Sequence, residues 1–239
     1  MDKTQLGHHI SQQFNEELED VRNRVLAMGG LVEQQLASAV KAVAESDRAL
    51  AEQVVANDYK VNAMEVAIDE ECSRVLARRQ PAAGDLRLIV AVIKTITDLE
   101  RIGDQAERVG RMAIKLLDSE GPDRHYVDMQ HLGSHVLQML HDALDAFARM
   151  DAEAAVQAAR EDVKIDQEYE ALMRQLITYM MEDARTISPV LDVMWAVRAL
   201  ERIGDHARNI CEYIIYLVKG KDVRHTSLDH MEEEVRRSR

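Results

Sequence analysis

The chain has 239 residues, with 30 Lys plus Arg against 43 Asp plus Glu, and a formal net charge of −13. Such an acidic chain repels a phosphate backbone, so we expect no nucleic-acid partner. Hydrophobic residues make up 46% of the chain, which excludes a disordered protein, and ten glycines with three prolines are too few for a sandwich of short strands. Composition therefore favours an all-α fold.

Long stretches of 3.6-residue hydrophobic periodicity are separated by Pro81, Pro122 and Pro189. Two further breaks are indicated by Ser46–Asp47 and Asp151, which precede Ala-rich periodic runs and suit helix N-caps. The sequence thus predicts six helices, at 8–45, 47–79, 85–118, 126–149, 151–184 and 188–219. Long helices with short connections pack as antiparallel neighbours in a bundle.

The chain contains an internal repeat. The hexapeptide LERIGD occurs at 99–104 and again at 200–205, 101 residues later. Before it, an offset of 104 aligns Leu36 with Leu140, Asp47 with Asp151, Asp58 with Asp162, Lys60 with Lys164 and Val61 with Ile165. The helical hairpin before the motif is therefore three residues shorter in the second copy. A duplicated unit of this kind predicts two tandem three-helix bundles.

We place the first bundle at residues 1–121 and the second at 122–220, with the boundary near Gly121–Pro122. Residues 221–239 have no apolar stripe, so we expect a loose C-terminal tail.

Cys72 and Cys211 lie in periodic runs and form no CxxC motif, which indicates a reducing compartment. The first residues lack the layout of a signal peptide, and no apolar run approaches the length of a membrane span. We therefore expect a cytoplasmic protein without a transmembrane segment.

Each hexapeptide carries two carboxylates one helical turn apart. Glu100 and Asp104 share one helix face, as do Glu201 and Asp205, although like charges at this spacing destabilise a helix. Spacing alone also fits a solvated edge beside the apolar stripe. Duplication at equivalent places, and a glycine inside each motif that allows close approach of a helix or a ligand, favour a binding site.

The predicted helical hairpins bring further oxygen ligands to the height of these motifs. In the first copy they are Asp58, Asn62 and Glu65; in the second they are Asp162, Asp166 and Glu170. Gathered carboxylates need a cation or a proton to relieve their repulsion. Oxygen ligands favour hard cations, so we expect iron, Mg, Mn or Ca at each motif.

A catalytic interpretation stays open. Di-iron carboxylate bundles use Glu-x-x-His on paired helices, and this chain contains no such motif. His131 and His135 are four residues apart and could bind a metal, but they also fit a pair on a helix surface. His206 follows Asp205 and points about 100° away from it around the helix, which argues against a role as co-ligand. A carboxylate-bridged di-metal oxidase or hydrolase, and a purely structural bundle, therefore remain alternatives.

Several segments are similar to a known family. They are KTITDLERIGDQAERV at 94–109, ALERIGDHARNICEY at 199–213, VKGKDVRH at 218–225 and PAAGDLR at 81–87. Together with the two tandem bundles, they resemble the PhoU family over essentially the whole chain. The family's metal motif falls on Glu100 and Asp104 and on Glu201 and Asp205. Asn62 stands where the second copy has Asp166, which would weaken the first site.

The resemblance implies a cytoplasmic, homodimeric and non-enzymatic regulator of phosphate uptake and of phosphate-starvation signalling. Such a regulator represses the phosphate-starvation response when phosphate is plentiful. The expected partners are the ATPase subunit of a phosphate ABC transporter and a membrane sensor histidine kinase. The protein would then lie at the membrane only through these partners. The resemblance also implies a metal cluster in each repeat, often of iron.

Overall fold

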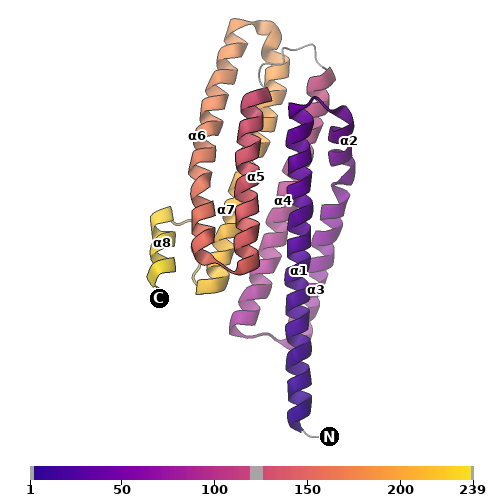
Figure 1. Ribbon diagram of the computed structural model, residues 1–239, viewed down its shortest axis with the longest axis vertical. Coiled ribbons are helices and arrows are strands. Elements are labelled where there is room, and N and C mark those ends of the chain that lie inside the picture. Colours follow the sequence, from indigo (N-terminus) through magenta and orange to yellow (C-terminus); the bar gives the residue numbers. More distant parts are fainter. Residues whose placement is uncertain (1–2, 119–125, 238–239) are drawn as a thin grey trace.

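The computed structural model describes residues 3–118 and 126–237, and every regular element within these residues is a helix (Figure 1). The elements are α1 (Lys3–Ala44), α2 (Arg48–Asn57), α3 (Tyr59–Arg79), α4 (Ala83–Asp118), α5 (Tyr126–Arg149), α6 (Ala152–Glu182), the 3₁₀ helix η2 (Ala184–Thr186), α7 (Ile187–Lys219) and α8 (Leu228–Arg237). The predicted all-α fold is confirmed.

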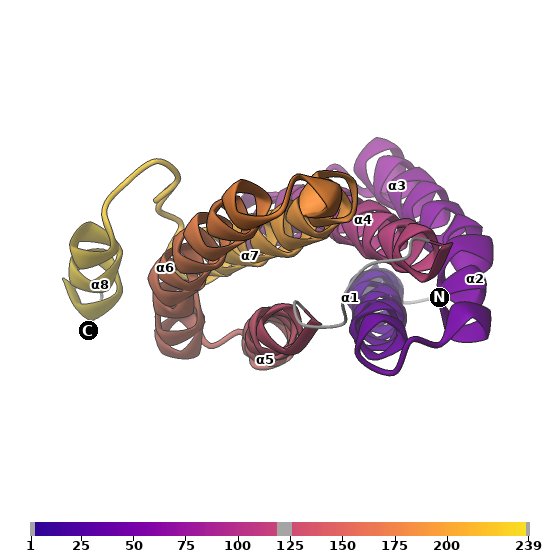
Figure 2. The same cartoon turned by 90° about the horizontal axis from the view of Figure 1, so that it is seen from above.

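The helices form two bundles side by side. One contains α1, the α2–α3 arm and α4, and the other contains α5, α6 and α7 (Figure 2). The predicted boundary near Gly121–Pro122 lies outside the described residues, so the domain limits stay a prediction. Buried hydrophobic side chains form one core cluster that runs through both bundles.

Both predicted N-caps are present at equivalent places. The carboxylate of Asp47 accepts a hydrogen bond from the Leu50 amide at 3.0 Å. The carboxylate of Asp151 accepts hydrogen bonds from the amides of Glu153 and Ala154, each at 3.0 Å. These side chains satisfy amide groups that have no partner inside the helix, so they fix where α2 and α6 begin.

The predicted helix at 47–79 is interrupted at Asp58. The amide of Val61 donates to the Asp58 carbonyl at 2.9 Å, a 3₁₀-type bond, whereas the Asn62 amide lies 3.4 Å from the same oxygen. The backbone of Asp58 keeps right-handed helical angles, so the interruption is a local tightening. In the second bundle α6 runs unbroken through the equivalent Asp162.

The two bundles are related by an approximate two-fold axis, which is shown by reciprocal contacts at two glycines. A Cβ atom added to Gly29 would lie 2.6 Å from a methyl carbon of Leu144, and one added to Gly133 would lie 2.7 Å from a methyl carbon of Val40. Gly133 is the repeat equivalent of Gly29, and Leu144 is that of Val40. Reciprocal contacts of this kind characterise an isologous interface, here within one chain between α1 and α5.

The inner helices α4 and α7 pack along each other in opposite directions. Nδ1 of His206 lies 2.7 Å from Oδ1 of Asp98, and the Lys115 ammonium lies 3.8 Å from the carboxylate of Asp192. Asp98 also accepts a hydrogen bond from the Asn209 amide at 3.2 Å. Because Asp98 and His206 are both buried, this polar link fixes the register between the repeats.

The prediction of a loose C-terminal tail is wrong for residues 221–237. There, α8 packs on α6, with Met231 and Val235 buried, and Val223 is buried ahead of it. Two apolar residues one turn apart are enough to dock a short amphipathic helix, although they make too short a stripe to stand out in the sequence. Within the described ranges, no helix is both long enough and apolar enough to cross a bilayer.

Candidate metal centre

The first carboxylate cluster lies where α4 approaches the junction of α2 and α3. A Cβ atom added to Gly103 would lie 3.2 Å from a methyl carbon of Val61 and 3.4 Å from Oδ1 of Asp58. The glycine inside LERIGD therefore lets the two helices approach at the height of Asp58. This approach brings Asp58 beside Glu100 and Asp104, as the helical hairpin predicts.

Amide side chains hold Asp58. Its Oδ1 accepts a hydrogen bond from Nε2 of Gln35 at 2.9 Å, and its Oδ2 accepts one from Nδ2 of Asn62 at 3.2 Å. Asp58 and Gln35 are buried. Among the described residues, no lysine or arginine forms an ion pair with Asp58, Glu100 or Asp104. The charge of this cluster is therefore not neutralised by direct contacts.

The carboxyl groups of the first cluster disfavour one another's ionisation. Desolvation, followed by the charges of Asp104, Glu65 and Asp58, raises the pKa of Glu100. Desolvation and the charge of Asp58 raise the pKa of Asp104. The pKa of Glu65 is raised in the same way, by desolvation first and then by neighbouring carboxylates. A cation placed among these groups would remove this repulsion.

The second cluster repeats this geometry between α6 and α7. A Cβ atom added to Gly204 would lie 3.3 Å from a methyl carbon of Ile165 and 3.7 Å from Oδ1 of Asp162. Asp162 is buried, and its Oδ2 accepts a hydrogen bond from Nη1 of Arg208 at 2.9 Å. Desolvation and the charge of Asp162 raise the pKa of both Asp166 and Asp205.

Glu201 is the most perturbed carboxyl of the second cluster. It is buried, and its Oε1 accepts a hydrogen bond from Nη1 of Arg198 at 2.5 Å. Its Oε2 is buried and has no hydrogen-bond partner among the described residues. Burial, followed by the charge of Asp205, raises the pKa of Glu201 to about 7. An unpartnered, buried carboxylate oxygen is costly, and a bound cation is one way to satisfy it.

The structure brings each predicted quartet together without closing it into a ligand shell. Asp58, Asp162 and Glu201 are buried and Glu100 is partly buried. The exposed members form the rim of each cluster: Asn62, Asp104, Asp166 and Asp205. In residues 3–118 and 126–237, no three His, Cys, Asp or Glu side chains are arranged to hold a metal ion. The donor chemistry fits a hard cation, and the rim carboxylates would have to turn inward.

Three residues of these clusters were not predicted from the sequence: Gln35, Arg198 and Arg208. Gln35 comes from α1, and its repeat equivalent is Met139, so repeat comparison points away from it. Arg208 offers a clearer signal, because its equivalent in the first repeat is Glu107. A reversal of charge one turn after a duplicated acidic motif marks the two sites as different.

The histidine pair on α5 contacts glutamates of α6 rather than each other. Nδ1 of His135 lies 2.9 Å from Oε1 of Glu168, and Nε2 lies 3.1 Å from Oε2 of Glu161. Nδ1 of the exposed His131 lies 3.4 Å from Oε2 of Glu168. Both ring nitrogens of His135 are therefore used to connect α5 with α6, in agreement with a surface pair.

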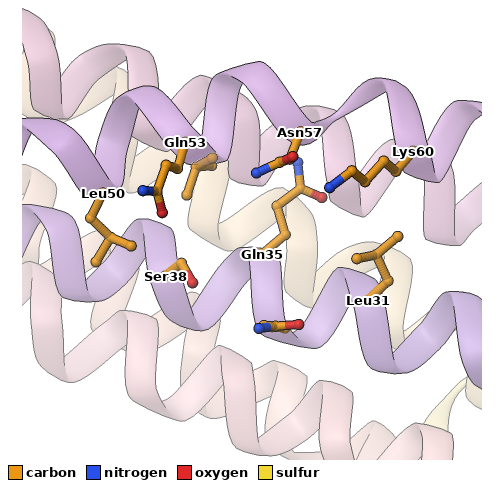
Figure 3. A pocket seen from close by; sticks show the side chains of 9 residues that line it. Leu31, Gln35, Ser38, Leu50, Gln53, Asn57 and Lys60 are labelled. Atoms are coloured by element: carbon orange, nitrogen blue, oxygen red, sulfur yellow. The ribbon is translucent and has the colours of Figure 1, made fainter.

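A pocket of about 190 Å³ lies beside the first cluster, between α1 and the α2–α3 arm (Figure 3). It is lined by Leu31, Gln34, Gln35, Ser38, Leu50, Gln53, Val54, Asn57 and Lys60. None of the predicted carboxylates lines it. Gln35 extends from α1 toward Asn57 in Figure 3, and its amide donates to Asp58, so this residue links the pocket to the cluster.

Comparison with known proteins places these features in a family. The profile of the PhoU domain matches residues 25–113 and 129–214, one match in each repeat. The chain is 57% identical over 239 residues to a phosphate-specific transport system accessory protein PhoU homolog of Pseudomonas aeruginosa, covering 100% of this chain and 99% of the relative. It is 53% identical over 233 residues to PhoU of Escherichia coli, covering 98% and 96%.

Solved structures agree with this similarity. The crystal structure of PhoU from Pseudomonas aeruginosa matches with a TM-score of 0.85 at 57% identity, over 87% of this chain and 100% of that one. The structure of the phosphate transport system regulatory protein PhoU from Streptococcus pneumoniae matches with a TM-score of 0.81 at 31% identity, over 88% and 99%. The chain described here belongs to the PhoU family.

Proposed function

We propose that this protein is a non-enzymatic regulator of phosphate uptake and of phosphate-starvation signalling, which represses the starvation response when phosphate is plentiful. The observation that carries the proposal is the near full-length similarity, at 53% and 57% identity, to relatives named as phosphate-specific transport accessory proteins. The matching of both repeats to the PhoU domain supports the same conclusion.

In this proposal the protein is an adaptor that connects a phosphate ABC transporter, through its ATPase subunit, with a membrane sensor histidine kinase. It would work in the cytoplasm as a homodimer and reach the membrane through these partners. Exposed apolar side chains near the α6–α7 end are suited to a protein interface, because large exposed apolar groups often mark interaction sites. They are Ile177 and Met181 of α6, four residues apart, and Ile187, Leu191 and Trp195 of α7, spaced every four residues.

The two carboxylate clusters are proposed to bind hard cations such as iron, Mg, Mn or Ca. Support comes from the gathering of four acidic or amide side chains at equivalent places, from the raised pKa values of Glu100 and Glu201 and, among the described residues, from the unpartnered Oε2 of Glu201. The first cation would be held by Glu100, Asp104, Asp58 and Asn62, and the second by Glu201, Asp205, Asp162 and Asp166. A bound cation would brace α3 against α4 and α6 against α7.

A di-metal oxidase or hydrolase has less support. The chain contains no Glu-x-x-His motif of the kind that di-iron carboxylate bundles use. A second pocket of about 190 Å³ is lined by Asp128, His131 and Glu168, but it includes no member of either carboxylate cluster. The nine residues of the pocket in Figure 3 include no carboxylate, histidine or cysteine that could serve as a general acid or base. The carboxylate clusters lie outside that pocket, partly on the surface. We therefore assign the cations a structural or signalling role.

The proposed function is tested by deleting the gene in its native host and measuring phosphate uptake and a phosphate-starvation reporter in phosphate-rich medium. Deletion should raise both, and the intact gene should restore repression. A deletion strain with unchanged reporter and uptake would contradict the regulatory role. Crosslinking in cells should also recover the transporter ATPase subunit and the kinase, and recovery of neither would contradict the adaptor role.

A further inference from the structure

The two carboxylate clusters differ in what balances the charge of their buried aspartate. In the second repeat, Nη1 of Arg208 lies 2.9 Å from Oδ2 of Asp162, and its Nε lies 3.5 Å from Oε1 of Glu212. The side chains of Asp162 and Glu212 are 4% and 8% exposed, so the guanidinium group lies between two buried carboxylates. Arg208 is thus a cation built into the second site.

Within the described part of the first repeat, no arginine or lysine is hydrogen-bonded to the equivalent buried aspartate. Glu107 stands at the position equivalent to Arg208, and its carboxylate pairs with Arg111 on the next turn of α4, at 2.5 Å. The equivalent buried aspartate, Asp58, accepts hydrogen bonds only from the neutral amides of Gln35 and Asn62 among the described residues. An amide lowers the cost of burying a carboxylate, but it leaves the full negative charge in place.

The second site nevertheless keeps an open ligand position. In the part of the chain that the structure describes, Oε2 of Glu201 is buried without a hydrogen-bond partner, although Oε1 of the same group accepts a hydrogen bond from Arg198. A cation at the second site could therefore bind Oε2 of Glu201, whereas Asp162 is already hydrogen-bonded to Arg208. A cation that also binds Asp162 has to displace Arg208.

We propose that Arg208 competes with metal for Asp162, so that the two sites of this chain fill in order, the first repeat before the second. This inference rests on the proposed metal clusters and adds an order of occupancy to them. A cation entering the second site must replace the Arg208–Asp162 ion pair, whereas a cation entering the first site replaces hydrogen bonds from amides. Since charge-assisted bonds are about twice as strong as neutral ones, the cation must overcome more at the second site. The proposed order requires this cost to exceed the gain from Asp166, which stands where the first site has Asn62.

The test is a titration of metal-free, full-length protein with Mn²⁺ alone, with free Mn²⁺ followed by electron paramagnetic resonance. The wild-type protein should bind in two phases, with dissociation constants that differ by at least about tenfold, which corresponds to about 1.4 kcal/mol. The E100Q/D104N variant should lose the tighter phase, and the E201Q/D205N variant should lose the weaker phase.

Two substitutions then change the competitor itself. R208Q/E212Q removes the guanidinium group together with its second buried partner, so that Asp162 is the one carboxylate of this trio that keeps its charge, and it should tighten the weaker phase by about tenfold. E107R places a guanidinium group at the equivalent position of α4 and should weaken the tighter phase. R149Q removes an equal charge from the exposed Arg149–Asp145 pair and should change neither phase.

The results separate this inference from the proposed function. Two phases of equal affinity, or a weaker phase that R208Q/E212Q leaves unchanged, would overturn the role of Arg208 while leaving the metal sites in place. Because E107R does not depend on the folding of the R208Q/E212Q variant, unchanged tight binding in E107R would count against the inference independently. Binding of no Mn²⁺ at either motif would overturn both the inference and the metal sites.

Discussion

The two repeats share the residues that shape the backbone and differ in the residues that balance charge. Gly103 and Gly204 each allow a neighbouring helix to approach, and Asp47 and Asp151 each cap a helix. In contrast, Arg208 of the second repeat is replaced by an acidic residue in the first. A duplicated scaffold can thus keep one geometry at two sites while their electrostatics diverge.

The same comparison applies to the helices that carry the buried aspartates. The first repeat is interrupted at Asp58, where α2 gives way to α3, whereas α6 continues through Asp162. Asp58 is tied to α1 by Gln35 and to α3 by Asn62, while Asp162 is tied to α7 by Arg208. Each buried carboxylate therefore connects its helix to a different neighbour.

The largest expected difference between the repeats is in stability. In the metal-free protein, R208A should lower the free energy of unfolding by about 3 kcal/mol, because it leaves Asp162 and Glu212 as buried charges without their partner. The equivalent E107A removes only a pair with the exposed Arg111 and should cost less than about 0.5 kcal/mol. Urea denaturation of both variants measures the difference, and equal losses would refute the proposed asymmetry of charge balance.

The link between α4 and α7 provides a second contrast. H206L should lower the free energy of unfolding by about 2 kcal/mol, because the buried carboxylate of Asp98 loses its closest donor. Gln105 is the repeat equivalent of His206, and its buried Oε1 has no hydrogen-bond partner within residues 3–118 and 126–237. Q105L should therefore change the free energy of unfolding by less than about 0.5 kcal/mol or increase it. Thermal unfolding at pH 7 compares the two, and a larger loss in Q105L would contradict this interpretation.

The helix caps should behave alike in both repeats. D47A and D151A should each lower the free energy of unfolding by about 1 kcal/mol, because each leaves the first amides of a helix without an acceptor. D47N and D151N serve as controls, since asparagine is an equally good cap. A loss confined to one repeat in urea denaturation would mean that the duplicated caps are not equivalent.

A smaller effect is expected from pH. Glu201 has a folded-state pKa of about 7 against its ordinary value of 4.5, so its ionisation opposes folding. Glu201 therefore lowers the free energy of unfolding progressively as pH rises from 4.5 to about 7. Above about pH 7 its effect on the free energy of unfolding changes little. In metal-free protein, E201Q should therefore reduce the loss of stability between pH 5.5 and pH 7.5, and E100Q should do so less because Glu100 is more exposed. A steeper pH dependence in E201Q would contradict the raised pKa.

Much of the fold and of the site follows from local sequence signals. The duplicated LERIGD, the capping aspartates and the periodicity determine which helices form and how they pair. Once the hairpins are drawn, helix rise alone places Asp58 and Asp162 opposite the motifs. These predictions succeed because each depends on residues close in sequence or on one turn of known length.

What the sequence did not reveal depends on contacts between distant segments. Gln35 reaches Asp58 from α1, and no periodic pattern distinguishes it from other polar residues of that helix. The interruption at Asp58 and the docking of α8 through Met231 and Val235 are set by tertiary packing, which overrides weak local preference. The ion pair of Arg208 with Asp162 joins residues 46 positions apart.

Anomalous diffraction from crystals grown with Mn²⁺ tests most directly whether the duplicated carboxylates are cation sites. We expect a peak between α3 and α4, beside Asp58, Glu100 and Asp104, at low Mn²⁺ concentration. A second peak, beside Asp162, Glu201 and Asp205, should join it only as the concentration rises. Crystals that hold no Mn²⁺ at either motif, even at saturating concentration, would contradict the assignment of these carboxylates as cation sites.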